Sequence, residues 1–77
     1  MNAFTVRQEI EQGQVVFFCY QNHTAVSTHK SADTAWNSAE AKAKSLAMKT
    51  NSNALYTTCP PEFLDESGAP RAAWVVK

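Results

Sequence analysis

The stretch VVFFCY, residues 15–20, places six apolar or aromatic residues in a row within a chain of 77 residues. In a β-strand, successive side chains point to opposite faces of the sheet, so both faces of this strand are apolar. The two alternating sets are Val15, Phe17 and Cys19, and Val16, Phe18 and Tyr20. Both faces of the sheet around this strand therefore need a cover.

The flanking segments predict strands that pair with this stretch. FTVRQEI, residues 4–10, alternates apolar with polar side chains except at Gln8, which is typical of a half-buried strand. Gly13 in the intervening EQGQ readily takes the positive φ that tight hairpin turns need, so the two runs should pair antiparallel. Asn22 favours a second turn, and AVSTHK, residues 25–30, predicts a weaker third strand at an exposed edge.

From residue 31 the hydrophobic period becomes that of an amphipathic helix. In SADTAWNSAEAKAKSLAM the small and apolar residues recur at three- and four-residue spacings, which defines one helix face. Ser31 or Asp33 can cap the N-terminus, and Asn51 or Asn53 can end the helix in the left-handed conformation. Trp36 lies on the apolar stripe and is predicted to pack against the sheet as a core residue.

Two further strands and a loop complete the predicted fold. ALYTTC, residues 54–59, ends at two prolines, and residues 60–71 form a loop with a short strand or helical turn at EFL. AAWVVK, residues 72–77, is the closing strand. The result is a single domain of residues 1–77 in the α+β class, with two layers. It has an antiparallel sheet of four or five strands (β-β-(β)-α-β-β) and one amphipathic helix on one face.

One helix covers only one face of the sheet. We assign the Cys19 set to the helix side, because Tyr20 on the other set tolerates a wet edge. Three covers are then possible for the second face: the loop that carries Phe63, a second copy of the chain, or a target protein.

Composition and charge disfavour several classes of function. Seven Lys and Arg balance seven Asp and Glu, which disfavours nucleic-acid binding and DNA mimicry. The chain opens with no basic segment followed by an apolar run, and it has no run of about 18 apolar residues. We therefore expect a cytoplasmic protein without a membrane partner.

The sequence carries no catalytic, cofactor or metal-binding motif. Cys19 and Cys59 fit two buried free thiols, because nothing indicates secretion. Together with His23 and His29 they lack the closely spaced cysteine pair that is typical of structural zinc. The acidic residues of the loop 60–71 fit a solvated turn. We expect no enzyme, no cofactor and no metal.

An uncovered apolar sheet face favours a binding function, since monomeric proteins rarely expose a large apolar patch. Aromatic residues on that face would be anchors, and basic residues would form its rim. The expected partner-binding residues are Phe18, Tyr20, Tyr56, Trp74, Lys30 and Arg71. A homodimer that packs sheet on sheet would bury the same patch. The same aromatic residues would also suit stacking of single-stranded nucleic-acid bases.

The layout as a whole resembles that of the anti-CRISPR proteins, small proteins that phages encode against host defences. The hairpin, the Ala-rich helix SADTAWNSAEAKAKSLAM and the closing strands carry this resemblance, which transfers no functional residue. It implies a non-enzymatic inhibitor in the host cytoplasm that binds a subunit of a CRISPR effector complex and blocks DNA recognition or nuclease recruitment. The alternative is a single-stranded nucleic-acid-binding or homodimeric structural module of phage or bacterial origin.

Overall fold

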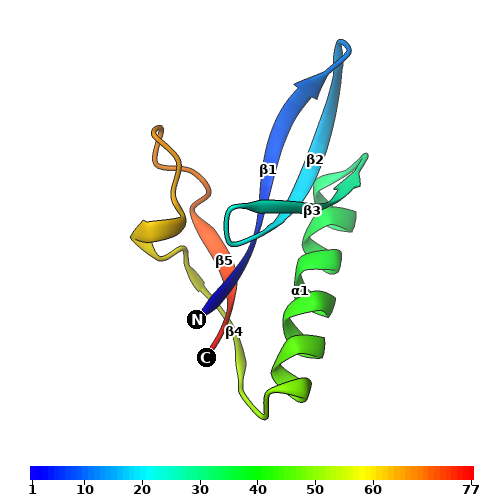
Figure 1. Cartoon of the computed structure of the whole chain (residues 1–77). Coiled ribbons are helices and arrows are strands. Elements are labelled where there is room, and N and C mark those ends of the chain that lie inside the picture. Colours follow the sequence, from blue (N-terminus) through cyan, green and yellow to red (C-terminus); the bar gives the residue numbers. More distant parts are fainter.

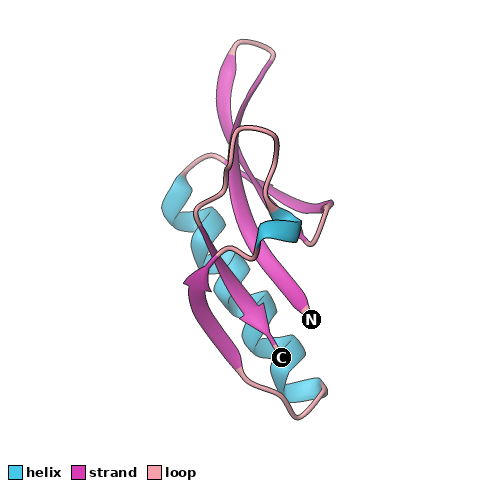
Figure 2. Ribbon diagram, turned by 90° about the vertical axis from the view of Figure 1, so that its left-hand side faces the viewer, coloured by secondary structure: helices cyan, strands magenta, loops and turns pink.

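The computed structural model describes all 77 residues and shows one antiparallel sheet with a long helix on one face (Figures 1 and 2). The strands are β1 (Asn2–Glu11), β2 (Gln14–Gln21), β3 (Thr24–His29), β4 (Ala54–Thr58) and β5 (Ala72–Val76). Helix α1 (Ala32–Lys49) follows β3, and a single 3-10 turn, η1 (Pro61–Phe63), lies between β4 and β5. The order in the sheet is β3-β2-β1-β5-β4. The predicted α+β two-layer fold is confirmed, and no helix has the length and apolar character to cross a membrane.

The two turns of the meander form at the residues that the sequence indicates. Gln12 and Gly13 have φ values of 51° and 78°, the positive values that a two-residue hairpin turn requires. Asn22 has a φ of 58°, and its side-chain Oδ1 accepts a hydrogen bond from the backbone N–H of Ala3 at 2.9 Å. These turns keep β1 and β2 in an unbroken antiparallel register from Phe4 to Glu11.

Helix α1 also begins and ends where its sequence predicts. Ser31 is the N-cap, and its Oγ accepts a hydrogen bond from the backbone N–H of Thr34 at 3.2 Å, which satisfies one of the free donors of the first turn. Just past the last turn, Asn51 has a φ of 53°. The face toward the sheet consists of small residues, all of them buried: Ala35, Ala39, Ala43 and Ala47. The helix backbone therefore lies close to the sheet.

The helix-side core confirms the faces that we assigned along β2. Cys19 is fully buried in this core and Phe17 packs against it. Val15 shares their face by alternation, but it is 48% exposed. Trp36 was expected in the core, whereas the structure places it half-buried at the margin, edge-on to Tyr56 with ring centroids 5.7 Å apart.

The opposite face has a second, smaller core that the loop 60–71 builds. Phe63 of η1 is buried there with residues of two strands, Ala3 of β1 and Ala73 and Val75 of β5, and with Cys59, which directly follows β4. Figure 1 shows this loop on the side of the sheet away from α1. Of the three covers considered for the second face, the Phe63 loop is thus present. It covers β1 and β5, while Phe18 and Tyr20 of β2 stay outside the cluster and half-buried.

Candidate functional site: the projecting hairpin

The β1–β2 hairpin extends beyond the rest of the sheet (Figure 1). Strand β1 is ten residues long, but only Asn2–Phe4 pair with β5. Strand β2 pairs with β3 no further toward its start than Phe17. Residues 9–16, here named the arm, therefore form a two-stranded ribbon whose outer edges have no neighbouring strand. Such a ribbon is at best marginally stable in water without other support.

The arm carries apolar side chains in solvent. Ile10 and Val15 face each other across the two strands, and they are 75% and 48% exposed. The pair Glu9 and Val16 comes next in the ladder and projects to the opposite face. Both faces of the arm thus present an apolar side chain.

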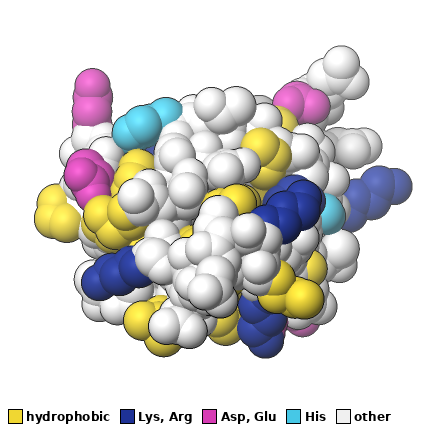
Figure 3. Space-filling view, turned by 60° about the horizontal axis from the view of Figure 1, so that its bottom comes forward, with side chains coloured by type: hydrophobic (Ala, Val, Ile, Leu, Met, Phe, Trp, Pro, Cys, Tyr) yellow, Lys and Arg dark blue, Asp and Glu magenta, His cyan; other side chains and the backbone are white.

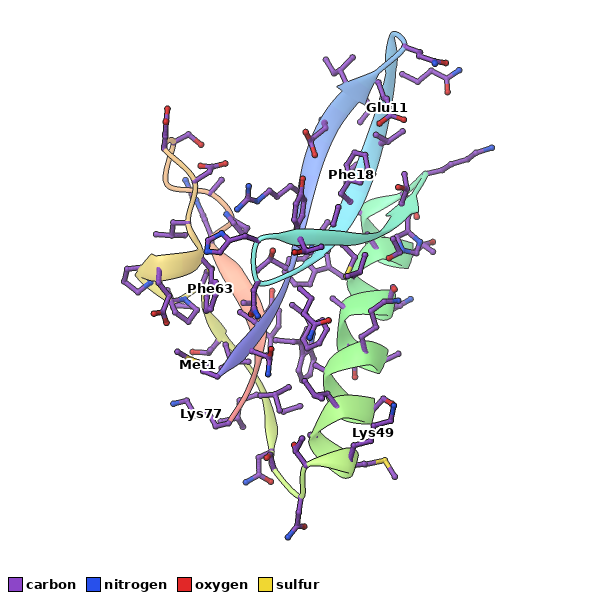
Figure 4. All side chains as sticks on the ribbon, viewed as in Figure 1. Met1, Glu11, Phe18, Lys49, Phe63 and Lys77 are labelled. Atoms are coloured by element: carbon purple, nitrogen blue, oxygen red, sulfur yellow. The ribbon has the colours of Figure 1, made fainter.

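On the face away from α1, the arm continues into a short aromatic surface, Val16, Phe18 and Tyr20, here named the strip. The rings of Phe18 and Tyr20 lie 6.3 Å apart with a tilt of 57°, within the range of favourable aromatic pairs. Figure 4 shows Phe18 on the hairpin, well separated from Phe63 in the loop. The strip is therefore a part of this face that the loop leaves open.

Polar neighbours fix the position of Tyr20. Its hydroxyl donates a hydrogen bond to Oε2 of Glu9 at 3.0 Å, and the guanidinium carbon of Arg7 lies 4.7 Å from its ring centroid. Partial burial, and then the hydrogen bond and negative charge of Glu9, raise the pKa of Tyr20. The phenol is therefore protonated at neutral pH and donates to the carboxylate. A side chain held in this way loses little conformational entropy when a partner packs on it.

Arg7 marks the border between the strip and the loop. Its Nη2 donates a hydrogen bond to the backbone carbonyl of Phe63 at 3.3 Å. Its Nε is buried without a hydrogen-bond partner. The same holds for Oγ1 of Thr5, two residues earlier in β1 and also on the face away from α1. The loop is thus attached to β1 through Arg7.

The six residues expected to bind a partner do not form one surface. Tyr56 and Trp74 lie on the helix side, with their rings 5.5 Å apart, and Nζ of Lys44 is 5.5 Å from the Trp74 ring centroid. They do not belong to the face of Phe18 and Tyr20, so a single platform of four aromatic side chains is not formed. The basic residues Lys30 and Arg71 are both exposed, outside the strands, between β3 and α1 and before β5.

Sequence reasoning missed the exposure of Ile10, which the alternation of FTVRQEI places on the half-buried face. The signal was present in the lapse at Gln8. Gln8 and Phe17 are opposite each other in the ladder, and from Gln8 to the turn every residue of β1 is exposed. A polar residue on the apolar face therefore marks the point where the core ends and the arm begins.

The two thiols and the acidic loop show no activated group. Cys19 and Cys59 are free and belong to different cores on opposite faces of the sheet. Burial raises the pKa of both thiols, which is the opposite of what a reactive thiolate needs. No group of three or more His, Cys, Asp or Glu side chains is arranged to hold a metal ion.

The arm and the strip are thus two parts of one hairpin that the rest of the fold leaves uncovered. Comparisons of the chain with protein-family models, with curated proteins and with solved structures found no match. No function is therefore carried over from a relative. The residues of this hairpin are the basis for the assignment of function.

Proposed function

We propose that this protein is a non-enzymatic binding module that occupies the surface of a partner protein through its β1–β2 hairpin. The observation that supports this proposal is the apolar surface on both faces of the arm. Ile10 and Val15 project on one face, and the strip continues from the other. A ribbon with apolar side chains on both faces gains the most binding free energy when it inserts into a groove of a partner protein, because both faces are then removed from water.

The hairpin also offers groups that can contribute binding free energy to an interface. Tyrosine and other large aromatic residues are frequent anchors of protein interfaces, and Tyr20 is already held by Glu9 and Arg7. The unpaired outer edges of the arm offer backbone N–H and C=O groups to which a partner strand can add. Side-chain anchors and backbone pairing are thus available on the same hairpin.

Charge on the hairpin suits a protein partner better than a nucleic acid. Arg7, Glu9 and Glu11 place both signs of charge along β1, whereas binding to a phosphate backbone depends on clustered positive charge. The partner class that the anti-CRISPR-like layout suggests, a subunit of a CRISPR effector complex in the host cytoplasm, belongs to the same proposal. The protein would then block DNA recognition or nuclease recruitment by occupancy.

Affinity capture with matched variants tests the proposal. The bait proteins are the wild type, the double variant Ile10→Ser/Phe18→Ser and the control Met48→Ser, which alters the most exposed large apolar side chain, on α1 and away from the hairpin. The lysate comes from bacteria that carry a CRISPR effector, and capture is compared with and without nuclease treatment. We expect one protein to bind the wild type and the control and to be lost from the double variant. With that protein purified, loss of both anchors should weaken binding about a hundredfold.

Three results would contradict the proposal. One is capture that disappears on nuclease treatment, which would indicate a nucleic-acid partner. Another is capture that the double variant does not change while circular dichroism shows all three baits folded. The third is a dimer in light scattering that only the double variant dissociates, because the hairpin would then bind a second copy of the chain.

A further inference from the structure

A groove of about 490 Å³ lies between α1 and the part of the sheet that includes β3. Its apolar lining is Phe4, Val26, Ala41 and Leu46, and its polar lining is Gln21, Ser38, Lys42, Ser45 and Lys49. This volume falls in the usual range of ligand sites. The groove is on the helix side of the sheet, and neither the arm nor the strip contributes to its lining.

A β-bulge supplies one wall of the groove. Cys19 pairs with Ser27, but the next residue of β2, Tyr20, pairs with Ala25. Val26 is therefore an extra residue without a partner across the ladder, and bulges of this kind re-aim a side chain. Here the re-aimed side chain of Val26 lines the groove and is 40% exposed.

The charge of the groove is positive and unpaired. Lys42 and Lys49 are its only charged lining residues, and the only ion pair of the protein joins Lys44 to Glu40. Nζ of Lys42 instead donates a hydrogen bond to Oγ of Ser38 at 2.9 Å. Figure 3 shows the molecule with the lower end of Figure 1, where α1 ends, turned toward the viewer. Basic side chains lie among hydrophobic ones on this surface, and acidic side chains lie toward its margins. The groove is therefore partly apolar and carries two lysines without a carboxylate partner, in a chain of zero formal net charge.

We infer that this groove binds an acidic amphipathic helix of a partner protein. Lys42 and Lys49 are seven positions apart on α1 (49 − 42), a rise of about 10 Å, or two helical turns on one face. A partner helix that lies along α1 can have acidic residues seven positions apart, and these would then lie opposite Lys42 and Lys49. Its apolar side chains between them then meet Leu46 and Val26, as in other helix-in-groove complexes.

The dimensions of the groove agree with a helical occupant. The lining residues on α1 run from Ser38 to Lys49, which is about 16 Å of helix and matches about three turns of a partner. Ala41 and Ser45 are small and exposed, so a second helix can approach α1 closely at the middle of the groove. This inference goes beyond the hairpin proposal and does not depend on it, because the two surfaces share no residue.

Fluorescence anisotropy of a labelled peptide tests the inference. The probe is a fluorescein-labelled amphipathic helical peptide with a Leu and Ala face flanked by Glu at heptad spacing, and the control probe has Lys at each Glu position. The protein should bind the Glu peptide and not the Lys peptide. The variant Lys42→Glu/Lys49→Glu should bind the Glu peptide about tenfold more weakly. The charge-matched variant Lys30→Glu/Arg71→Glu, outside the groove, should change binding less than about twofold.

A second pair of variants tests the groove without changing its charge. Ala41→Trp fills the groove and should abolish binding, whereas Met48→Trp, on the same helix but outside the groove lining, should not. The inference is overturned if the Glu peptide fails to bind at millimolar protein, or if both peptides bind equally. It is also overturned if the two charge variants lose equal affinity, or if the chain self-associates and Lys42→Glu/Lys49→Glu alone prevents it, which would assign the groove to a second copy.

Discussion

The ring of His23 packs against the ring of Phe63, with centroids 5.5 Å apart and planes inclined by 45°. His23 belongs to the turn between β2 and β3, whereas Phe63 belongs to η1 in the loop 60–71. Phe63 is thus enclosed by the sheet below and by this turn at its side. Together with the hydrogen bond from Arg7 to its carbonyl, the contact fixes how far the loop covers the second face.

Phe63 should therefore be a major source of stability in spite of its place in a loop. We expect Phe63→Ala to lower the free energy of unfolding by about 3 kcal/mol, because a nearly buried aromatic side chain is replaced by a cavity. Urea unfolding followed by tryptophan fluorescence measures the loss. As a control, Leu55→Ala removes an apolar side chain that is 52% exposed and should cost less than about 1 kcal/mol. Equal losses in the two variants would show that the loop does not seal the face.

Replacement of an alanine of α1 by a larger side chain should be destabilising on the side that faces the sheet and tolerated on the exposed side. Ala43 is fully buried against the sheet, whereas Ala41 is exposed on the same helix. We expect Ala43→Leu to destabilise the protein by about 2 kcal/mol, because the added atoms must push the helix from the sheet. Ala41→Leu has the same change in composition and helix propensity and should stay within about 0.5 kcal/mol of the wild type. Thermal unfolding by circular dichroism compares the pair, and a tolerant Ala43 would contradict the close helix–sheet contact.

The elements of the fold could be predicted because local chemistry determines them. Ser31 caps α1, Gly13 and Asn22 form the turns, and the change from a period of two to one of three and four separates strands from helix. The alternation along β2 also placed Cys19 correctly on the helix side. A small thiol fits between the sheet and a closely packed helix, whereas a tyrosine tolerates partial exposure to water on the other face. These signals lie within a few residues of the elements that they define.

The surfaces could not be predicted in the same way, because they depend on contacts between distant segments. The cover over β1 and β5 requires Phe63 to meet His23 and Arg7, and no local pattern reports those contacts. The face of Tyr56 was not determined by ALYTT, in which neither alternating set is clearly apolar. The bulge at Val26 has no signal in AVSTHK, so the groove that it lines was not anticipated.

Burial of Cys19 should make the protein less stable at alkaline pH. Burial raises the pKa of this thiol, although Lys42 and the hydrogen bonds to Ser27 and Ser38 act in the opposite direction. The stability that the folded protein gains from the protonated thiol is fully present below the pKa of this thiol in the unfolded chain, about 8.5. It is lost as pH rises from there toward the folded pKa, because only the unfolded thiol ionises.

Urea unfolding at a series of pH values from neutral to about 9.5 measures this effect, the upper limit being set to keep tyrosine ionisation small. The free energy of unfolding should fall at the alkaline end, and it should fall less steeply in Cys19→Ala. A thiol reagent should react with neither cysteine in the folded protein at neutral pH and with both in urea. An alkaline decline that is identical in the wild type and in Cys19→Ala would exclude the thiol as its source.

Asp65 should produce the opposite dependence at acid pH. Its Oδ1 accepts hydrogen bonds from Oγ of Ser67 at 2.7 Å, from the backbone N–H of Ser67 at 2.9 Å and from that of Ala69 at 3.0 Å. The side-chain hydrogen bond from Ser67, followed by that from the Ala69 backbone, lowers the pKa of Asp65. The folded state therefore gains stability from the carboxylate above the unfolded pKa of about 3.9, and this gain is lost as pH falls through the folded value.

The variant Ser67→Ala removes the main cause of that shift. In an NMR titration of the side-chain carboxyl carbon, the pKa of Asp65 should lie below the ordinary value in the wild type and return toward it in Ser67→Ala. The variant should be less stable than the wild type at neutral pH, and the difference should shrink below the folded pKa, where Asp65 is protonated in both proteins. Ser45→Ala, which alters an exposed serine on α1, should leave the titration of Asp65 unchanged. If Ser67→Ala left the pKa of Asp65 at its wild-type value, the turn would not be held by this hydrogen bond.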